Sequence, residues 1–155
     1  MLSPQNASGC PSSQTIDAFL TFAQAKYKVD AKRIYLTGLS CGAIGSWSYL
    51  TSHKGATVAA ALLISGDPGN AWAADGCGLV ANLALWSVHG DMDPRVAYGG
   101  DHDAMINLLA CPKPPRKDVK WTPVAGGQHD VWTKTYDLSG GYGDVYAWML
   151  ANAKP

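Results

Sequence analysis

The chain has 155 residues, of which 47% are hydrophobic and 15% are charged. This balance is typical of a folded protein and excludes an intrinsically disordered one. The formal net charge is +0 at pH 7, so charge offers no case for a partner such as nucleic acid or an anionic membrane. At this length we expect one domain over residues 1–155 with a sizeable core.

Short apolar runs alternate with stretches of helical periodicity along the chain. We predict strands at residues 34–37, 58–64, 84–89 and 119–124, and helices at 13–27, 41–52, 101–110, 131–136 and 144–152. Residues 1–3 read as the end of a further strand and residues 67–78 as a loop. Strands that alternate with helices favour an α/β fold, with a mostly parallel sheet flanked by helices on both faces.

The segment from Gly38 to Gly42 carries a Gly-x-Ser-x-Gly pattern between a predicted strand and a predicted helix. In a nucleophile elbow, the serine occupies a sharp, strained turn that lifts its hydroxyl clear of the backbone. We expect Gly38 and Gly42 to lie where a Cβ would strike the neighbouring strand or helix. The backbone N–H of Cys41 would then point at a developing oxyanion beside Ser40.

Two further groups follow later strands, and they complete a chemical pattern. Asp91 and Asp93 come after the strand at 84–89, and His129 follows the strand at 119–124. The carboxyl ends of parallel strands meet at one edge of a sheet, so Ser40, one aspartate and His129 should converge there. We favour Asp93 as the carboxylate, since it lies further round its loop and can reach back, whereas Asp91 would stabilise the turn.

Four segments of the chain resemble α/β-hydrolase esterases of the polyhydroxybutyrate depolymerase and feruloyl/acetylxylan esterase group. They are LSPQ (residues 2–5), VDAKRIYLTGLS (29–40), WSVHGDMD (86–93) and GGQHDVW (126–132), with Tyr136 beyond the last. The resemblance implies a reduced α/β-hydrolase fold with a Ser40, Asp93 and His129 triad, because its His-Gly-x-x-Asp pattern places the acid at Asp93. It treats His89 as structural.

The resemblance begins in the middle of the family's domain, so this would be an N-terminally shortened version. The missing part normally supplies a strand beside the elbow strand and the second oxyanion N–H. The loss of one such donor can cost about 2.7–4 kcal/mol of transition-state stabilisation. Amides around Gln5 could substitute for it, a second subunit could cover the open sheet edge as a homo-oligomer, or the chain could be a fragment with little activity. We favour the first two.

Aromatic side chains near the elbow are candidates for the substrate pocket. Core packing is the default for such residues, but Trp132 lies three residues after His129, and Trp47 lies on the helix after Ser40. For the adjacent Asp101, His102 and Asp103, we expect a solvated helix start and not a metal site. The reaction chemistry that we infer requires no cofactor.

Four cysteines occur without a C-x-x-C spacing, so a zinc site is not expected. Three complete pairings are open. We favour a Cys77–Cys111 bridge, because both residues lie in segments that read as loops, and regard Cys41 as the least suited to a bridge. The first residues lack the pattern of a signal peptide, and cytoplasmic and secreted locations both stay open.

The sequence therefore predicts a serine carboxylesterase that hydrolyses short-chain or aromatic carboxylic esters through an acyl-enzyme intermediate. Two alternatives remain. One is a serine peptidase or polyester depolymerase that uses the same triad. The other is a catalytically inactive hydrolase remnant that serves as a binding or assembly module.

Overall fold

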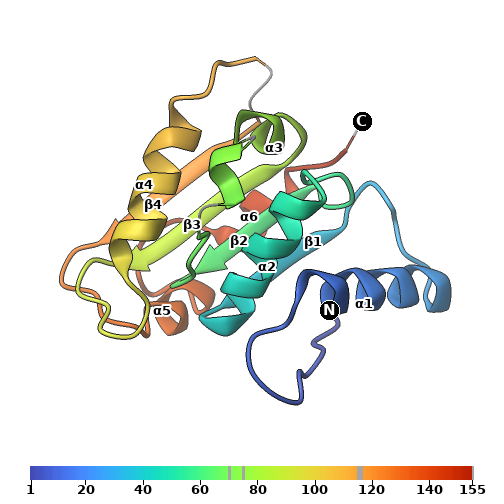
Figure 1. The fold of residues 1–155 in the computed structure, drawn as a ribbon, viewed down its shortest axis with the longest axis horizontal. Coiled ribbons are helices and arrows are strands. Elements are labelled where there is room, and N and C mark those ends of the chain that lie inside the picture. The colour runs from blue at the N-terminus through green and yellow to red at the C-terminus, as the bar shows by residue number, and fades with distance from the viewer. Residues whose placement is uncertain (70, 75, 115–116, 155) are drawn as a thin grey trace.

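The computed structural model describes residues 1–69, 71–74, 76–114 and 117–154. Its centre is a parallel sheet with the order β1-β2-β3-β4, so each strand pairs with the next one along the chain. The strands are β1 (Tyr35–Leu39), β2 (Ala60–Ile64), β3 (Ala84–Gly90) and β4 (Val119–Val124). The predicted parallel α/β fold is confirmed (Figure 1).

Helices cover both faces of this sheet (Figure 1). One face carries α1 (Ser13–Lys26), α2 (Cys41–Ser52), α3 (Gly76–Asn82) and α4 (Tyr98–Leu109), and the other carries α5 (Trp132–Tyr136) and α6 (Val145–Leu150). Helix α1 begins at residue 13 as predicted, and Ser12 caps it, because the Thr15 N–H donates to Ser12 Oγ. A short 3₁₀ helix, η1 (Ala71–Ala74), precedes α3.

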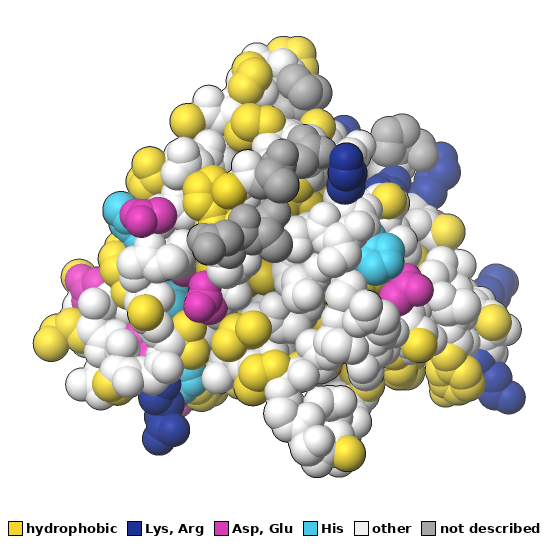
Figure 2. Space-filling model, viewed as in Figure 1, with side chains coloured by type: hydrophobic (Ala, Val, Ile, Leu, Met, Phe, Trp, Pro, Cys, Tyr) yellow, Lys and Arg dark blue, Asp and Glu magenta, His cyan; other side chains and the backbone are white. Residues whose placement is uncertain are grey.

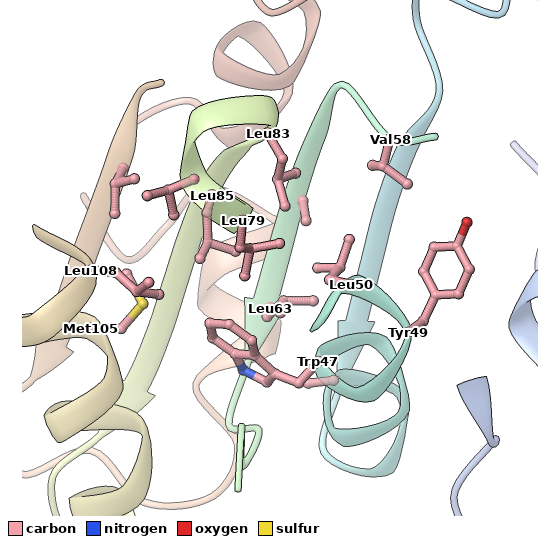
Figure 3. Close-up of a cluster of buried hydrophobic side chains, with 14 of the residues drawn as sticks. Trp47, Tyr49, Leu50, Val58, Leu63, Leu79, Leu83, Leu85, Met105 and Leu108 are labelled. Atoms are coloured by element: carbon pink, nitrogen blue, oxygen red, sulfur yellow. The ribbon is translucent and has the colours of Figure 1, made fainter. Parts of the chain in front are cut away.

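Alternate residues of each strand feed two separate apolar clusters. On β2, Leu63 faces the α2 side, while Leu62 and Ile64 face the α6 side. Every residue of β2 is buried, which is why this strand reads as a continuous apolar run. Figure 3 shows Leu63 near Trp47 of α2 and Leu85 of β3 in the first cluster. This double-sided core fixes the position of the strand ends that carry the site.

Strand β1 lies at an edge of the sheet and pairs with β2 alone among the described strands. The prediction that residues 1–3 are the end of a further strand was wrong, because they are exposed and form no strand. Cover of this edge by a second subunit stays a prediction. Positive and negative side chains are scattered over the face seen in Figure 2, and neither sign forms a continuous patch there.

The predicted loop over residues 67–78 is partly wrong, because η1 and the start of α3 fall within it. Helix α3 spans only seven residues and buries Leu79 and Val80, which is too short a stretch to show helical periodicity. Helix α4 also begins earlier than predicted, at Tyr98. Within the described ranges, no helix is long and apolar enough to cross a membrane.

Two disulfides join the cysteines. The expected Cys77–Cys111 bridge is confirmed and ties α3 to the end of α4. The expectation that Cys41 would stay unbridged was wrong, because Cys41 bonds to Cys10. Cys41 is exposed in the first turn of α2, whereas Ala43 in the same turn is buried. The side chain of Cys41 therefore faces the N-terminal segment and not the space beneath the elbow.

Burial of β2 predicts the stability effect of a single substitution. Leu63→Ala should lower the free energy of unfolding by about 2–5 kcal/mol, because it leaves a cavity among fully buried side chains. Leu150→Ala, at a side chain that is 60% exposed, should change it by no more than about 0.5 kcal/mol. Urea unfolding at equilibrium measures both values. Equal losses in the two variants would contradict this picture of the core.

Candidate active site

Ser40 occupies a strained turn between β1 and α2. Its φ is 48°, a left-handed conformation that is uncommon for residues other than glycine. Its N–H donates to the Ile64 carbonyl at 2.9 Å, which anchors the turn to the end of β2. A Cβ on Gly38 would lie 2.5 Å from the backbone of Gly42, so this turn needs glycine at position 38. The corresponding expectation for Gly42 was wrong, since a Cβ there meets nothing within 4 Å.

The side chains of Ser40, His129 and Asp93 form one hydrogen-bonded row. His129 Nε2 lies 2.9 Å from Ser40 Oγ, and His129 Nδ1 lies 2.7 Å from Asp93 Oδ2. In this arrangement Nδ1–H donates to the carboxylate, and Nε2 is free to accept the serine proton. The three residues come from the ends of β1, β3 and β4, as the parallel topology predicts.

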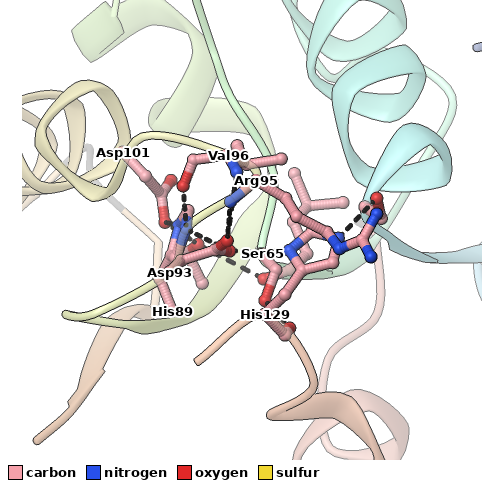
Figure 4. Close-up of polar contacts among 10 residues, drawn as sticks. Ser65, His89, Asp93, Arg95, Val96, Asp101 and His129 are labelled. Atoms are coloured by element: carbon pink, nitrogen blue, oxygen red, sulfur yellow. Dashed lines mark hydrogen bonds and ion pairs between the residues drawn. The ribbon is translucent and has the colours of Figure 1, made fainter. Parts of the chain in front are cut away.

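The Asp93 carboxylate is held by the loop in which it lies. Its Oδ1 accepts hydrogen bonds from the backbone N–H groups of Arg95 at 2.8 Å and Val96 at 3.0 Å (Figure 4). Burial would raise the pKa of Asp93, but the hydrogen bonds from His129, Val96 and Arg95 outweigh it and hold the pKa below its usual value. Asp91 differs from the turn role predicted for it, because its Oδ1 accepts the N–H of Gly126 at 2.7 Å and so joins its loop to the turn after β4.

The loop that carries His129 is held to the end of β2 by a side-chain hydrogen bond. Ser65, directly after β2, donates from Oγ to the His129 carbonyl at 2.8 Å. The ring of Trp132 meets the His129 ring edge-on, with centroids 5.0 Å apart. Sequence reasoning missed Ser65, which follows an apolar strand as an ordinary loop residue would. Like Ser40, Ser65 follows a strand and has a left-handed backbone, with a φ of 51°.

A pocket opens beside Ser40 and His129. Its apolar lining includes Trp132, and Cys41 lies at its wall, at the start of α2. The first N–H groups of a helix have no intrahelical partner, so the Cys41 N–H is available to a ligand. The lining residues are Ser40, Cys41, Ile44, Arg95, Val96, His129, Asp130 and Trp132.

Two expected site residues lie elsewhere. Trp47 does not line this pocket: it is fully buried in the core between α2 and the sheet (Figure 3). Its position on α2 turns it toward Leu63 and not toward Ser40. Gln5 is exposed and is not among the pocket residues, because the N-terminal segment does not run along β1. Neither residue is therefore retained as a site residue.

A second polar cluster lies behind Asp93, and its burial was not predicted. Asp101, expected at a solvated helix start, is instead completely buried near the start of α4. Its Oδ2 lies 3.2 Å from Nδ1 of His89, and Nε2 of His89 lies 3.2 Å from Asp93 Oδ2 (Figure 4). Helical spacing could have indicated the burial of Asp101, since Asp101 shares a face of α4 with the buried Met105 and Leu108.

Among the described residues, no group of three histidine, cysteine, aspartate or glutamate side chains could hold a metal ion. The acidic and imidazole groups of the site instead pair with one another, with a serine hydroxyl and with backbone N–H groups. The arrangement fits proton transfer and nucleophilic attack by a hydroxyl.

Solved hydrolase structures share this fold. A thermostable esterase aligns with a TM-score of 0.74 at 21% sequence identity, over 91% of this chain and 36% of that chain. The Bacillus cereus carboxylesterase has a TM-score of 0.62 at 17% identity, over 88% and 59% of the two chains. A candidate dipeptidyl aminopeptidase IV from Bacteroides ovatus has a TM-score of 0.65 at 12% identity, over 90% and 22%.

These likenesses show the fold, and they confirm that the chain has a reduced form of the α/β fold seen in esterases. The chain spans between about a third and three fifths of the length of the two esterases. No protein-family model matches the sequence, and no curated protein matches it.

The loops of Asp93 and His129 touch at a glycine, which predicts a second substitution effect. A Cβ on Gly90 would lie 2.3 Å from the Gly127 carbonyl oxygen and 2.4 Å from that of Gln128. Gly90→Ala should therefore force the two loops apart and cost about 1–3 kcal/mol of stability. Gly99→Ala is the matched control, because nothing lies within 4 Å of its Cβ, and it should stabilise α4 by about 0.5–1 kcal/mol. Thermal unfolding of both variants tests this, and equal melting temperatures would contradict it.

The low pKa of Asp93 predicts a pH-dependent contribution to stability. Because the folded-state pKa lies below the usual value of 3.8, the charged group stabilises the fold fully above that value. The contribution is lost as the pH falls through the folded-state pKa. The difference in unfolding free energy between the wild type and Asp93→Asn should thus be larger at pH 7 than at pH 3. Denaturant unfolding at the two pH values measures it, and a constant difference would exclude a lowered pKa.

Proposed function

We propose that this chain is a serine hydrolase that cleaves carboxylic esters. The observation that carries the proposal is the hydrogen-bonded row in which His129 bridges Ser40 Oγ at 2.9 Å and Asp93 Oδ2 at 2.7 Å. A strained serine at a strand-to-helix turn supports it, since an ordinary glycine-rich loop explains neither the strain nor the histidine.

The proposed reaction has two acyl-transfer steps. Ser40 Oγ attacks the ester carbonyl while His129 Nε2 takes its proton, and His129 then returns that proton to the leaving alcohol. Water, deprotonated by the same nitrogen, cleaves the acyl-enzyme and frees Ser40. Asp93 holds the ring with Nδ1–H toward it and stabilises the imidazolium form. The Cys41 N–H donates to the oxyanion of each tetrahedral intermediate.

The pocket lining supports short-chain or aromatic acyl groups as substrates. Ile44, Val96 and Trp132 supply apolar surface next to the nucleophile, and we assign Trp132 to substrate binding. Because Trp132 also meets the His129 ring, an acyl group against the indole would lie close to the base.

A serine peptidase is the second candidate. It is supported by the structural likeness to the candidate dipeptidyl aminopeptidase IV, which has a TM-score of 0.65. The same row of side chains can cleave an amide, with His129 protonating the amine that leaves. Casein degradation that depends on Ser40 would favour this candidate over the esterase.

Hydrolysis of p-nitrophenyl acetate and butyrate tests the proposal. Ser40→Ala and His129→Ala should reduce hydrolysis to the background rate, and Asp93→Asn should lower kcat by about 10⁴-fold through the wrong imidazole tautomer. A fluorophosphonate probe should label the wild type at Ser40 and leave Ser40→Ala unlabelled, as mass analysis can show.

If the wild type and both alanine variants hydrolyse the esters at one rate, and the probe labels none of them, the proposed enzyme function is wrong. The chain would then fit the reading of an inactive remnant that binds or assembles. Labelling of the wild type without ester turnover would instead point to an activated serine whose substrate is not a simple ester.

A further inference from the structure

Asp101 and His89 form a buried pair directly behind Asp93, and the proposed reaction does not use them. The side chains of both residues are completely inaccessible to solvent. His89 stands between two carboxylates, with Nδ1 3.2 Å from Asp101 Oδ2 and Nε2 3.2 Å from Asp93 Oδ2. Acids and bases thus alternate in one row through the molecule, in the order Asp101, His89, Asp93, His129, Ser40. Figure 4 labels the first four of these residues.

The contacts of His89 decide where its hydrogens lie. Its Nε2 faces two acceptors at 3.2 Å, Asp93 Oδ2 and the Val96 carbonyl, so this nitrogen must carry a hydrogen. Its Nδ1 faces Asp101 Oδ2, where two bare lone pairs would repel each other. A second hydrogen therefore lies between Nδ1 and Asp101, bonded to one atom or the other. In both cases the pair has a net charge of zero.

Burial explains why the pair keeps this proton. Asp101 Oδ2 accepts from Ser87 Oγ at 2.7 Å, but Oδ1 has no hydrogen-bond partner among the described residues, so a full charge there would be costly. Burial raises the pKa of Asp101 against the hydrogen bonds from His89 and Ser87. Burial would lower the pKa of His89, but its contacts with Asp101, Val96 and Asp93 outweigh it and raise the pKa. Both directions favour retention of the shared proton.

We propose that Asp101 is a positioning residue for the catalytic carboxylate. Through the hydrogen bond to His89 Nδ1, it fixes the His89 ring with its Nε2–H toward Asp93. That contact in turn holds Oδ2 of Asp93 in line with His129. Because the pair is neutral, it adds no second negative charge, and Asp93 keeps its own charge for the imidazolium of His129. This inference rests on the proposed hydrolase function.

Two substitutions at position 101 separate this role from packing. In Asp101→Asn, an amide nitrogen in place of Oδ2 can donate to His89 Nδ1 and to Ser87 Oγ, whose hydroxyl also lies 3.2 Å from the Leu63 carbonyl as a donor. The His89 tautomer is then preserved. Asp101→Leu has a similar size and offers no donor, so the ring loses its anchor.

Kinetics with p-nitrophenyl butyrate supply the first readout, with active sites counted by exhaustive fluorophosphonate labelling. Asp101→Leu should lower kcat by about 10- to 100-fold through misplacement of Asp93, with KM unchanged. Asp101→Asn should restore most of that loss. Asp103→Leu, the same change at an exposed carboxylate on α4, is the matched control and should leave kcat unchanged.

The second readout is nitrogen NMR of the histidine rings in the wild type, which needs no variant at position 101 to fold. The chain has four histidines, and single substitutions assign each ring. His89 should carry a hydrogen on Nε2, and Asp101→Asn should keep that hydrogen. A His89 ring that is bare at Nε2 in the wild type would overturn the proposal, even if Asp101→Leu fails to fold.

The kinetic outcomes are equally decisive. Loss of kcat in the leucine variant with rescue by asparagine supports the positioning role. Equal kcat in all variants, equal loss in both position 101 variants, or a rise in KM with kcat unchanged would each overturn it. A wild type that is inert to both ester and probe would instead refute the proposed hydrolase, and the NMR result would still judge the His89 pair by itself.

Discussion

The parallel pairing of the four strands is the constraint on which the site depends. Because all strands run the same way, the loops after β1, β2, β3 and β4 leave the sheet at one edge, and each brings a polar group. Ser40 follows β1, Ser65 follows β2, Asp93 follows β3 and His129 follows β4. The buried faces of β2 and β3 fix the register, since a slip by one residue would turn apolar side chains away from their clusters.

The fold was predictable because its signals are local and strong. Apolar or alternating segments marked every strand, and β2 showed the unbroken run that burial on both faces produces. The elbow was also predictable, because its steric requirement lies within five residues. A Cβ at position 38 would strike the backbone of Gly42, so a glycine is needed there. The order of Ser40, Asp93 and His129 followed from the topology, and the distances of 2.9 and 2.7 Å agree with it.

The features that could not be predicted from the sequence depend on where a side chain points and on how deeply it is buried. Trp47 lies on the helix that follows Ser40 and was therefore expected near the pocket. Its side chain points into the core and not into the pocket. Asp101 looked like an ordinary acidic residue at a helix start, where solvent is the usual neighbour. Its burial follows from the way α4 lies against β3, which brings Ser87 and His89 to it. Cys41 was misjudged because its partner, Cys10, lies in a segment without a periodic pattern.

The left-handed backbone at Ser40 has an implication for how this position is maintained. A glycine would adopt a φ of 48° without steric conflict, so folding considered by itself would favour glycine there. The serine persists at a place where its Cβ is a burden to the folded state, and its hydroxyl makes contact with an imidazole and not with a structural partner. Stability of the fold therefore favours glycine at position 40, whereas reactivity requires serine. The stability that the core around β2 contributes is what makes the strained serine tolerable.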